Sequence, residues 1–187
     1  MHPLLAVLFL ILPLHAQTGP KLVAAARKQV GVTLTYDPAY TDLEYPGGDV
    51  PPERGVCTDV VIRAARTGLS EDLQKLVHED MKAHFSAYPK QWGLSRPDKN
   101  IDHRRVPNLQ TFFKRRGFSV AVTKEPGDYQ PGDLVTCTVP PNLPHIMVVS
   151  DKKTDEGRPL VIHNIGRGAQ EEDVLFTYPL TGHYRWK

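Results

Sequence analysis

Apolar residues recur every three or four positions in four stretches of the chain, which is the spacing of one face of an α-helix. Glycine or proline stands near the ends of these stretches, where helices commonly start or stop. The pattern predicts four helices, at 20–31, 57–68, 70–85 and 106–117. Ser70 is the expected N-terminal cap of the third of them.

The last third of the chain has a different pattern. Short runs of β-branched and aromatic residues are separated by turn residues, as in antiparallel strands. Six strands are expected on this basis, at 118–123, 132–139, 145–151, 159–165, 173–178 and 183–186. Helices followed by antiparallel strands indicate an α+β fold.

Residues 32–55 form a long connection rich in Tyr, Asp, Pro and Gly, and they lead directly into the second expected helix. A structureless connection of this length inside a compact domain is usually a functional loop or lid. The sequence leaves open whether a regulatory partner acts on it.

The N-terminal segment is apolar over 4–14. This run is shorter than the roughly 20 residues that span a bilayer, and it has the character of a secretory signal ending near Ala16. We therefore expect 1–16 to be a signal peptide and 17–187 to be a single domain. The mature protein is expected to be periplasmic or secreted, without stable insertion in a membrane.

The 187 residues include 23 Lys and Arg and 21 Asp and Glu, which gives a net charge of +2 with neutral histidines. That surplus is too small to indicate binding to nucleic acid. Two basic triplets, 103–105 and 114–116, are expected on the solvated surface. The sequence has no cofactor motif.

The chain has two cysteines, Cys57 and Cys137. Exported proteins commonly pair their cysteines, but sequence separation alone does not show whether two side chains can meet. A disulfide is therefore one interpretation. The other gives Cys57 a chemical role, because it stands where the second helix is expected to begin.

A helix N-terminus suits a cysteine nucleophile. Unpaired backbone N–H groups and the helix dipole lower the pKa of a thiol there. The same amides, including that of Thr58, can receive the oxyanion that forms when a carbonyl is attacked. Asp59 in the first turn favours the helix dipole but would tend to raise the pKa of a nearby thiol.

Such a nucleophile needs a general base. His145 heads a run of Ile, Met and Val that is typical of a buried strand, and a third polar group must fix the tautomer of its imidazole. The next strand offers His163 and Asn164. Because successive side chains point to opposite faces of a strand, only one of the two can face His145, and alternation with Val161 and Ile165 slightly favours His163.

These features resemble the NlpC-type branch of the papain-like cysteine peptidases. The resemblance is carried by the helix-borne Cys57, by "GDLVTCTV" and "PHIMVVSD", and by a polar residue on the following strand. The strings "GVCTDVVIRAAR", "VHEDM", "NIDHRRVPNL", "IHNIG" and "GHYR" are similar to a bacterial domain-of-unknown-function family, number 1287. That similarity runs from about residue 24 to the C-terminus.

The resemblance implies N-terminal helices, with the cysteine at a helix N-terminus, packed on a C-terminal antiparallel sheet. It implies catalytic roles for Cys57, His145 and His163, in that order along the chain. An aromatic residue before the cysteine often lines the substrate site in this branch, and Tyr36 is the candidate here.

Members of the NlpC branch hydrolyse amide bonds in the peptide stems of peptidoglycan. The resemblance therefore implies an exported cysteine amidase or endopeptidase that acts on such a peptide and uses no cofactor. The sequence departs from the branch after the cysteine, where Thr58 and Asp59 replace a small residue and an aromatic-rich helix start.

Two other functions fit the same residues. His145, His163 and His183 stand on three of the expected strands and can converge on zinc, as in some hydrolases. Alternatively, the Tyr-rich loop 32–55 belongs to a non-catalytic module that binds cell-wall peptide, with an idle or oxidised Cys57.

Overall fold

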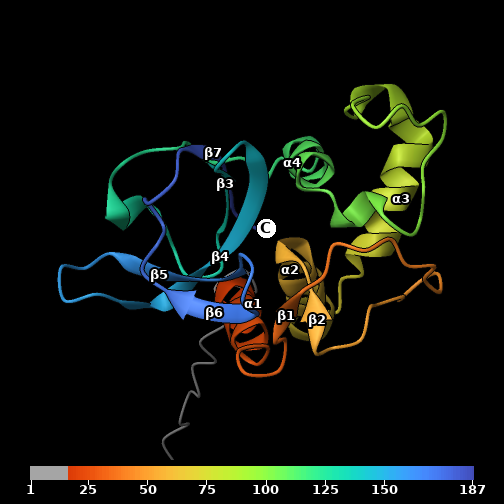
Figure 1. Cartoon of the computed structure of the whole chain (residues 1–187). Helices are drawn as coiled ribbons and strands as arrows, with labels where there is room; N and C mark the ends of the chain where they lie inside the picture. Colours follow the sequence, from red (N-terminus) through yellow and green to blue (C-terminus); the bar gives the residue numbers. More distant parts are fainter. Residues whose placement is uncertain (1–16) are drawn as a thin grey trace, which may run out of the picture.

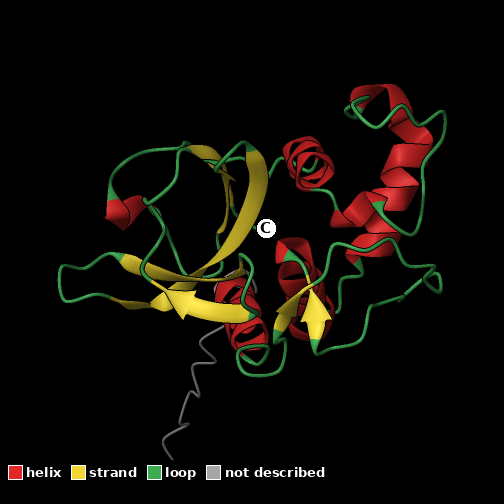
Figure 2. Ribbon diagram, viewed as in Figure 1, coloured by secondary structure: helices red, strands yellow, loops and turns green. Residues whose placement is uncertain are grey.

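The computed structural model describes residues 17–187, so the expected signal peptide at 1–16 lies outside the described residues. The sheet lies on one side of the molecule, and most of the helices lie on the other (Figure 1). The same view coloured by secondary structure shows how much of the chain is loop (Figure 2). The predicted order of N-terminal helices and C-terminal antiparallel strands is confirmed.

Four α-helices form close to the predicted positions. They are α1 (Thr18–Arg27), α2 (Cys57–Leu69), α3 (Leu73–His84) and α4 (Val106–Arg115). Within the described part of the chain, none of them is long and apolar enough to cross a membrane.

The predicted cap of α3 was wrong. Ser70 instead ends α2 in the left-handed conformation, with φ of 59°. Asp72 caps α3, because its carboxylate accepts the Gln74 N–H at 3.2 Å. The two helices are so close in sequence that Ser70 ends the first helix instead of starting the second.

The C-terminal part forms one antiparallel sheet in the order β6-β5-β4-β3-β7. Its strands are β3 (Leu134–Val139), β4 (Leu143–Lys153), β5 (Pro159–Asn164), β6 (Ala169–Glu172) and β7 (Leu180–Tyr184). A separate parallel pair, β1 (Thr35–Tyr36) and β2 (Arg54–Gly55), joins the start of the long loop to the segment just before α2.

Two of the six expected strands do not form. Residues 118–123 make one isolated bridge, between Ser119 and Tyr184. Residues 173–178 form a turn that buries Leu175 against the sheet, so their apolar side chains cover the sheet instead of extending it. Strand β6 was not predicted, because its sequence AQEE is polar and it lies at the edge of the sheet.

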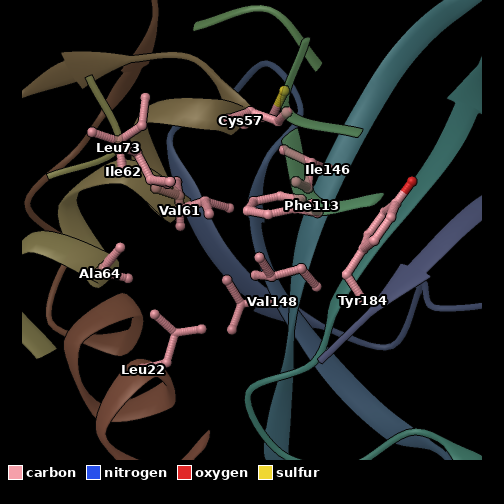
Figure 3. Packing of buried hydrophobic residues seen from close by; sticks show 14 of the residues in the cluster. Leu22, Cys57, Val61, Ile62, Ala64, Leu73, Phe113, Ile146, Val148 and Tyr184 are labelled. Carbon is pink, nitrogen blue, oxygen red and sulfur yellow. The ribbon is translucent and has the colours of Figure 1, made fainter. Parts of the chain in front are cut away.

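The two faces of the sheet are covered differently. Helices α1, α2 and α4 pack on one face, where Ile146, Val148 and Phe113 belong to the larger hydrophobic core (Figure 3). Turns cover the other face, where Met147 and Leu175 are buried. Alternate residues of β4 therefore point into different environments, which decides where His145 lies.

The long loop 32–55 is anchored along its length. The Arg63 guanidinium on α2 donates to the Asp49 carboxylate at 2.8 Å and to the carbonyl oxygens of Val50 and Pro51 at 2.9 and 3.2 Å. The Gly47 N–H donates to the Asp72 carboxylate at 2.8 Å. These contacts hold the loop against α2 and the start of α3.

Candidate active site

Cys57 is the first residue of α2, and 3% of it is exposed. The preceding residue, Val56, is extended, and its N–H donates to Asp59 Oδ2 at 2.7 Å, so that Asp59 caps the helix. Figure 3 shows Cys57 at the edge of the larger core, near Ile146. The backbone N–H groups of Ile146, Thr58 and Cys57 itself lie close enough to the sulfur to influence its pKa.

The pKa of the Cys57 thiol differs from the sequence-based expectation. Burial raises it to about 11, and the Asp59 carboxylate adds to the increase, as predicted. The three backbone N–H groups oppose this rise without cancelling it. The N–H groups at the helix start do lower the pKa, as expected, but desolvation of the nearly buried sulfur outweighs them, so the expectation of a lowered pKa overall was wrong. Near pH 7 the resting group is a neutral thiol.

A cleft of about 240 Å³ borders Cys57. Tyr36 lines it together with Cys57 and is 39% exposed, and the two side chains lie close enough for the thiol to influence the pKa of the phenol. The pairing of Tyr36 with Gly55 fixes this position, since Gly55 is two residues before the cysteine. Burial and the nearby thiol raise the pKa of Tyr36 to about 12, so its hydroxyl is available as a donor. The cleft also has Trp92 and Arg105 among its walls.

His145 and His163 lie next to each other on β4 and β5. His145 Nε2 is 2.7 Å from His163 Nδ1, and His163 Nε2 is 2.9 Å from Glu172 Oε1 on β6. Burial lowers the pKa of His145 to about 3. Burial also lowers the pKa of His163, although Glu172 opposes the effect. Both imidazoles are therefore neutral near pH 7.

This series of hydrogen bonds fixes the tautomer of each ring. A carboxylate can only accept a hydrogen bond, so His163 carries its proton on Nε2 and accepts through Nδ1. His145 must then donate from Nε2, which leaves its Nδ1 unprotonated. An unprotonated Nδ1 is the form that can take a proton from a thiol.

The side chains of Cys57 and His145 lie on opposite sides of β4. Ile146, whose N–H lies near the thiol, points into the helix-side core. His145 shares the opposite face with Met147 and is paired across the ladder with Cys137. The thiol thus lies near the strand backbone one residue from His145. The side-chain hydrogen bonds of residues 17–187 include none between Cys57 and His145. Cys57 and Cys137 are both free thiols.

Asn164 lies on the helix side of β5, so His163 and not Asn164 contacts His145. The Asn164 amide donates to the Gly55 oxygen at 3.0 Å and to the Thr35 oxygen at 3.3 Å. These bonds tie the sheet to β1 and β2 and thereby hold the segment that enters α2.

Asp59 is engaged by Arg104. The guanidinium donates to both carboxylate oxygens, at 3.0 and 2.9 Å, and also to the Asp37 and Ala39 oxygens at 3.2 and 3.1 Å. Thr58 is buried, and its hydroxyl donates to the Arg104 oxygen at 3.1 Å. Asp59 therefore has a structural role beside the site, since its carboxylate oxygens accept from the Val56 N–H and from the Arg104 guanidinium.

The expectation that 103–105 lies on the solvated surface was wrong, since His103 is 2% exposed and Arg104 is 6% exposed. Neither Arg104 nor Glu172 was identified from the sequence as part of the site. Recognition of β6 would have indicated Glu172, because it pairs with Val161 and so shares a face with His163. Arg104 gives no comparable signal, since its partner lies 45 positions away.

The zinc alternative is contradicted by the position of His183. Its Nε2 is 2.7 Å from Asp133 Oδ2 and its Nδ1 is 3.0 Å from the Ala121 oxygen, so both ring nitrogens are engaged away from His145. Among residues 17–187, no group of three or more His, Cys, Asp or Glu side chains is arranged to hold a metal ion. The three histidines do not converge.

The comparisons with known proteins agree with the family resemblance. A family model described as "Domain of unknown function (DUF1287)" matches residues 23–186. The chain belongs to the DUF1287 family. It is 57% identical over 176 residues to the protein described as "Uncharacterized protein YijF" from Escherichia coli (strain K12), with 94% of this chain and 85% of that protein covered.

Two crystal structures of an N-acetylmuramoyl-L-alanine amidase from Bacteroides uniformis share the fold of this DUF1287 protein. The TM-scores are 0.54 and 0.56, at 12% and 11% sequence identity. The matches cover 90% and 91% of this chain and 97% and 100% of the amidase chains. The fold is thus the α+β, papain-like fold that the sequence resemblance implied.

Proposed function

We propose that this protein is an exported cysteine amidase that cleaves an amide bond in the peptide stems of peptidoglycan, in the periplasm or outside the cell. One observation carries the proposal. The hydrogen-bonded series His145, His163 and Glu172 leaves Nδ1 of His145 unprotonated, and the next residue of the same strand, Ile146, has its N–H near the Cys57 thiol. A thiol, a base and a group that orients the base are what a cysteine hydrolase requires.

In the proposed reaction, His145 Nδ1 takes the thiol proton while the Cys57 sulfur attacks the carbonyl carbon of the substrate. A C–S bond forms, and the electron pair of the carbonyl double bond moves to the oxygen. Backbone N–H groups at the start of α2 stabilise this oxyanion. The C–N bond then breaks, and His145 returns the proton to the leaving amine. Water hydrolyses the thioester with His145 again as base.

Proton transfer requires the sulfur and His145 Nδ1 to come within hydrogen-bonding distance. Catalytic hydrogen bonds are often long without substrate and tighten in the enzyme–substrate complex. The proposed reaction therefore requires the Cys57 sulfur and the His145 ring to approach each other, by side-chain rotation and movement of β4, when the substrate binds. The neutral thiol and neutral imidazole of the resting site suit a general-base mechanism, in which the thiolate forms only during attack.

The substrate class is supported by two independent features. The Bacteroides structures that share the fold are of an N-acetylmuramoyl-L-alanine amidase. An export signal, as expected from residues 1–16, would bring this protein to the same polymer. Tyr36, beside the thiol, is proposed to contact the peptide.

The test is digestion of purified peptidoglycan, with products identified by mass spectrometry. Wild type is expected to release peptide-containing fragments, and Cys57→Ala should lower the rate by at least about a thousandfold while its melting temperature changes little. Cys137→Ala removes the other thiol and is expected to retain digestion. Digestion by Cys57→Ala at the wild-type rate would contradict the proposal, and wild-type binding to peptidoglycan without digestion would favour the binding module.

A further inference from the structure

The walls of the Cys57 cleft have a one-sided charge. Among the described residues that line it, two are arginines, Arg104 and Arg105, and none is acidic. Arg104 is neutralised by its two hydrogen bonds to the Asp59 carboxylate and is buried. Arg105 is therefore the cation of this cleft that a substrate can meet.

Arg105 is held in place by its neighbours and still has N–H donors for a ligand. Arg105 also has a carboxylate partner, since its Nη1 forms an ion pair with Asp102 Oδ1 at 3.2 Å. Unlike the contact of Arg104 with both oxygens of Asp59, this pair engages only one of the N–H donors of Arg105 among the side-chain hydrogen bonds of the described residues. The guanidinium carbon lies 4.2 Å from the centre of the Trp92 ring, which also lines the cleft. Stacking on an aromatic ring orients the planar group and leaves its edge for a ligand.

Two helix N-termini strengthen the positive potential at the same place. Helix α2 begins at Cys57 and α4 begins at Val106, and both residues line the cleft. The start of a helix carries partial positive charge from its unpaired N–H groups. An anionic group bound at Arg105 is therefore favoured by the backbone as well as by the guanidinium.

We propose that Arg105, stacked on Trp92, binds a carboxylate of the substrate, so that the cleft selects stem peptides with a free carboxylate near the scissile amide. The inference rests on the proposed function and names the substrate feature that this site recognises. The planar fork of a guanidinium matches the two oxygens of a carboxylate, whereas a carboxamide presents only one acceptor. Arg105 is thus a specificity-determining residue.

The test compares two ligands that differ at one group, N-acetylmuramoyl-L-alanine and N-acetylmuramoyl-L-alaninamide, in which a carboxamide replaces the single carboxylate. Binding is measured by calorimetry to Cys57→Ala protein, so that no turnover occurs. We expect the acid to bind about tenfold or more tightly than the amide, as a charged hydrogen-bonded pair typically provides.

Three further substitutions in the Cys57→Ala background locate the effect. Arg105→Gln is expected to abolish the preference for the acid. Arg105→Lys keeps a charge near Asp102 but lacks the fork, so an intermediate preference is expected even if Arg105→Gln perturbs the local fold. Arg116→Gln is the matched control, because this exposed arginine lies 5.9 Å from the Phe112 ring and does not line the cleft. It should keep the full preference.

Equal affinity for the two ligands, no binding of either, or a preference unchanged in Arg105→Gln would overturn the carboxylate subsite. Failure of the proposed hydrolase is seen separately, as absence of digestion by wild type. Preference for the acid without digestion would retain Arg105 as a recognition residue and remove only the chemistry.

Discussion

At the scale of single residues, the tautomer of His145 depends on Glu172, a residue that does not contact the substrate in the proposed reaction. Glu172 fixes the proton on His163, and His163 in turn fixes the proton on His145. Without an obligate acceptor at position 172, His163 can place its proton on Nδ1 and reverse the direction of the bond to His145. The base would then carry a proton on the nitrogen that needs to accept one.

Glu172→Gln tests this dependence. The amide can donate as well as accept, so part of the population should hold the wrong His145 tautomer. We expect kcat for peptidoglycan digestion to fall by about tenfold or more, with KM nearly unchanged. The upper limit of this loss is the roughly 10²–10⁴-fold that general acid–base catalysis contributes in full. Arg167→Gln is the control, since Arg167 donates to Glu172 at 2.6 Å from an exposed position. An equal loss in both variants would contradict the tautomer argument.

At the scale of elements, the ion pair of Asp59 and Arg104 joins the first turn of α2 to the 3₁₀ turn η3 (Asp102–Arg104) and to the long loop. Its side chains are 4% and 2% exposed. Removing one partner of such a buried pair leaves an uncompensated charge in the interior. The pair also fixes the loop end that carries Tyr36, so it affects both stability and the shape of the cleft.

Arg104→Ala is expected to lower the free energy of unfolding by about 3–5 kcal/mol, the range for breaking a buried pair. Arg158→Ala removes a pair with Asp173 whose side chains are 41% and 36% exposed, and it should cost less than about 1 kcal/mol. Urea denaturation of both variants measures the difference. Similar losses would show that burial of the Asp59–Arg104 pair does not decide its contribution.

The sequence was informative where a periodic pattern meets a single environment. The helix spacing placed Cys57 at a helix start, and the alternation in β5 separated His163 from Asn164. It was uninformative where long-range contacts decide. Arg104 stands in a basic triplet that looks solvated until Asp59 is brought to it, and β6 is polar because the sheet ends there. The thiol pKa was misjudged for the same reason, since desolvation comes from packing of distant segments.

At the scale of the whole molecule, Glu171 links the N-terminal helix to the sheet. Its carboxylate accepts from Arg27 Nη2 of α1 at 2.7 Å, and from Ser150 Oγ and Lys152 Nζ of β4 at 2.5 and 2.9 Å. Burial alone would raise the pKa of Glu171, but these hydrogen bonds outweigh it and lower the pKa to about 2. The ionised carboxylate therefore holds α1 against strands β4 and β6 of the sheet.

The lowered pKa predicts a pH dependence of stability. A carboxyl group with a depressed pKa in the folded protein stabilises it fully above the unfolded value, here 4.5, and loses that contribution as pH falls towards 2. The loss is at most about 3 kcal/mol. Urea unfolding of wild type and Glu171→Gln near about pH 6 and about pH 3 should show the two free energies converging in acid. Glu156→Gln, at an exposed position, is the control, and its difference from wild type in free energy of unfolding should stay the same at both pH values. If wild type and Glu171→Gln lose equal free energy between the two pH values, the assignment is contradicted.

The anchored loop beside Cys57 has a kinetic consequence. Arg104 holds it at Asp37 and Ala39, Arg63 holds it at 49–51, and Asp72 holds its middle at Gly47. A segment held by so many hydrogen bonds acts as a fixed wall of the cleft, so in the proposed reaction the substrate would enter and the product would leave without a hinge motion of the loop. In the proposed hydrolase, turnover is then limited by bond making and not by opening of the loop, so solvent viscosity should change kcat only weakly.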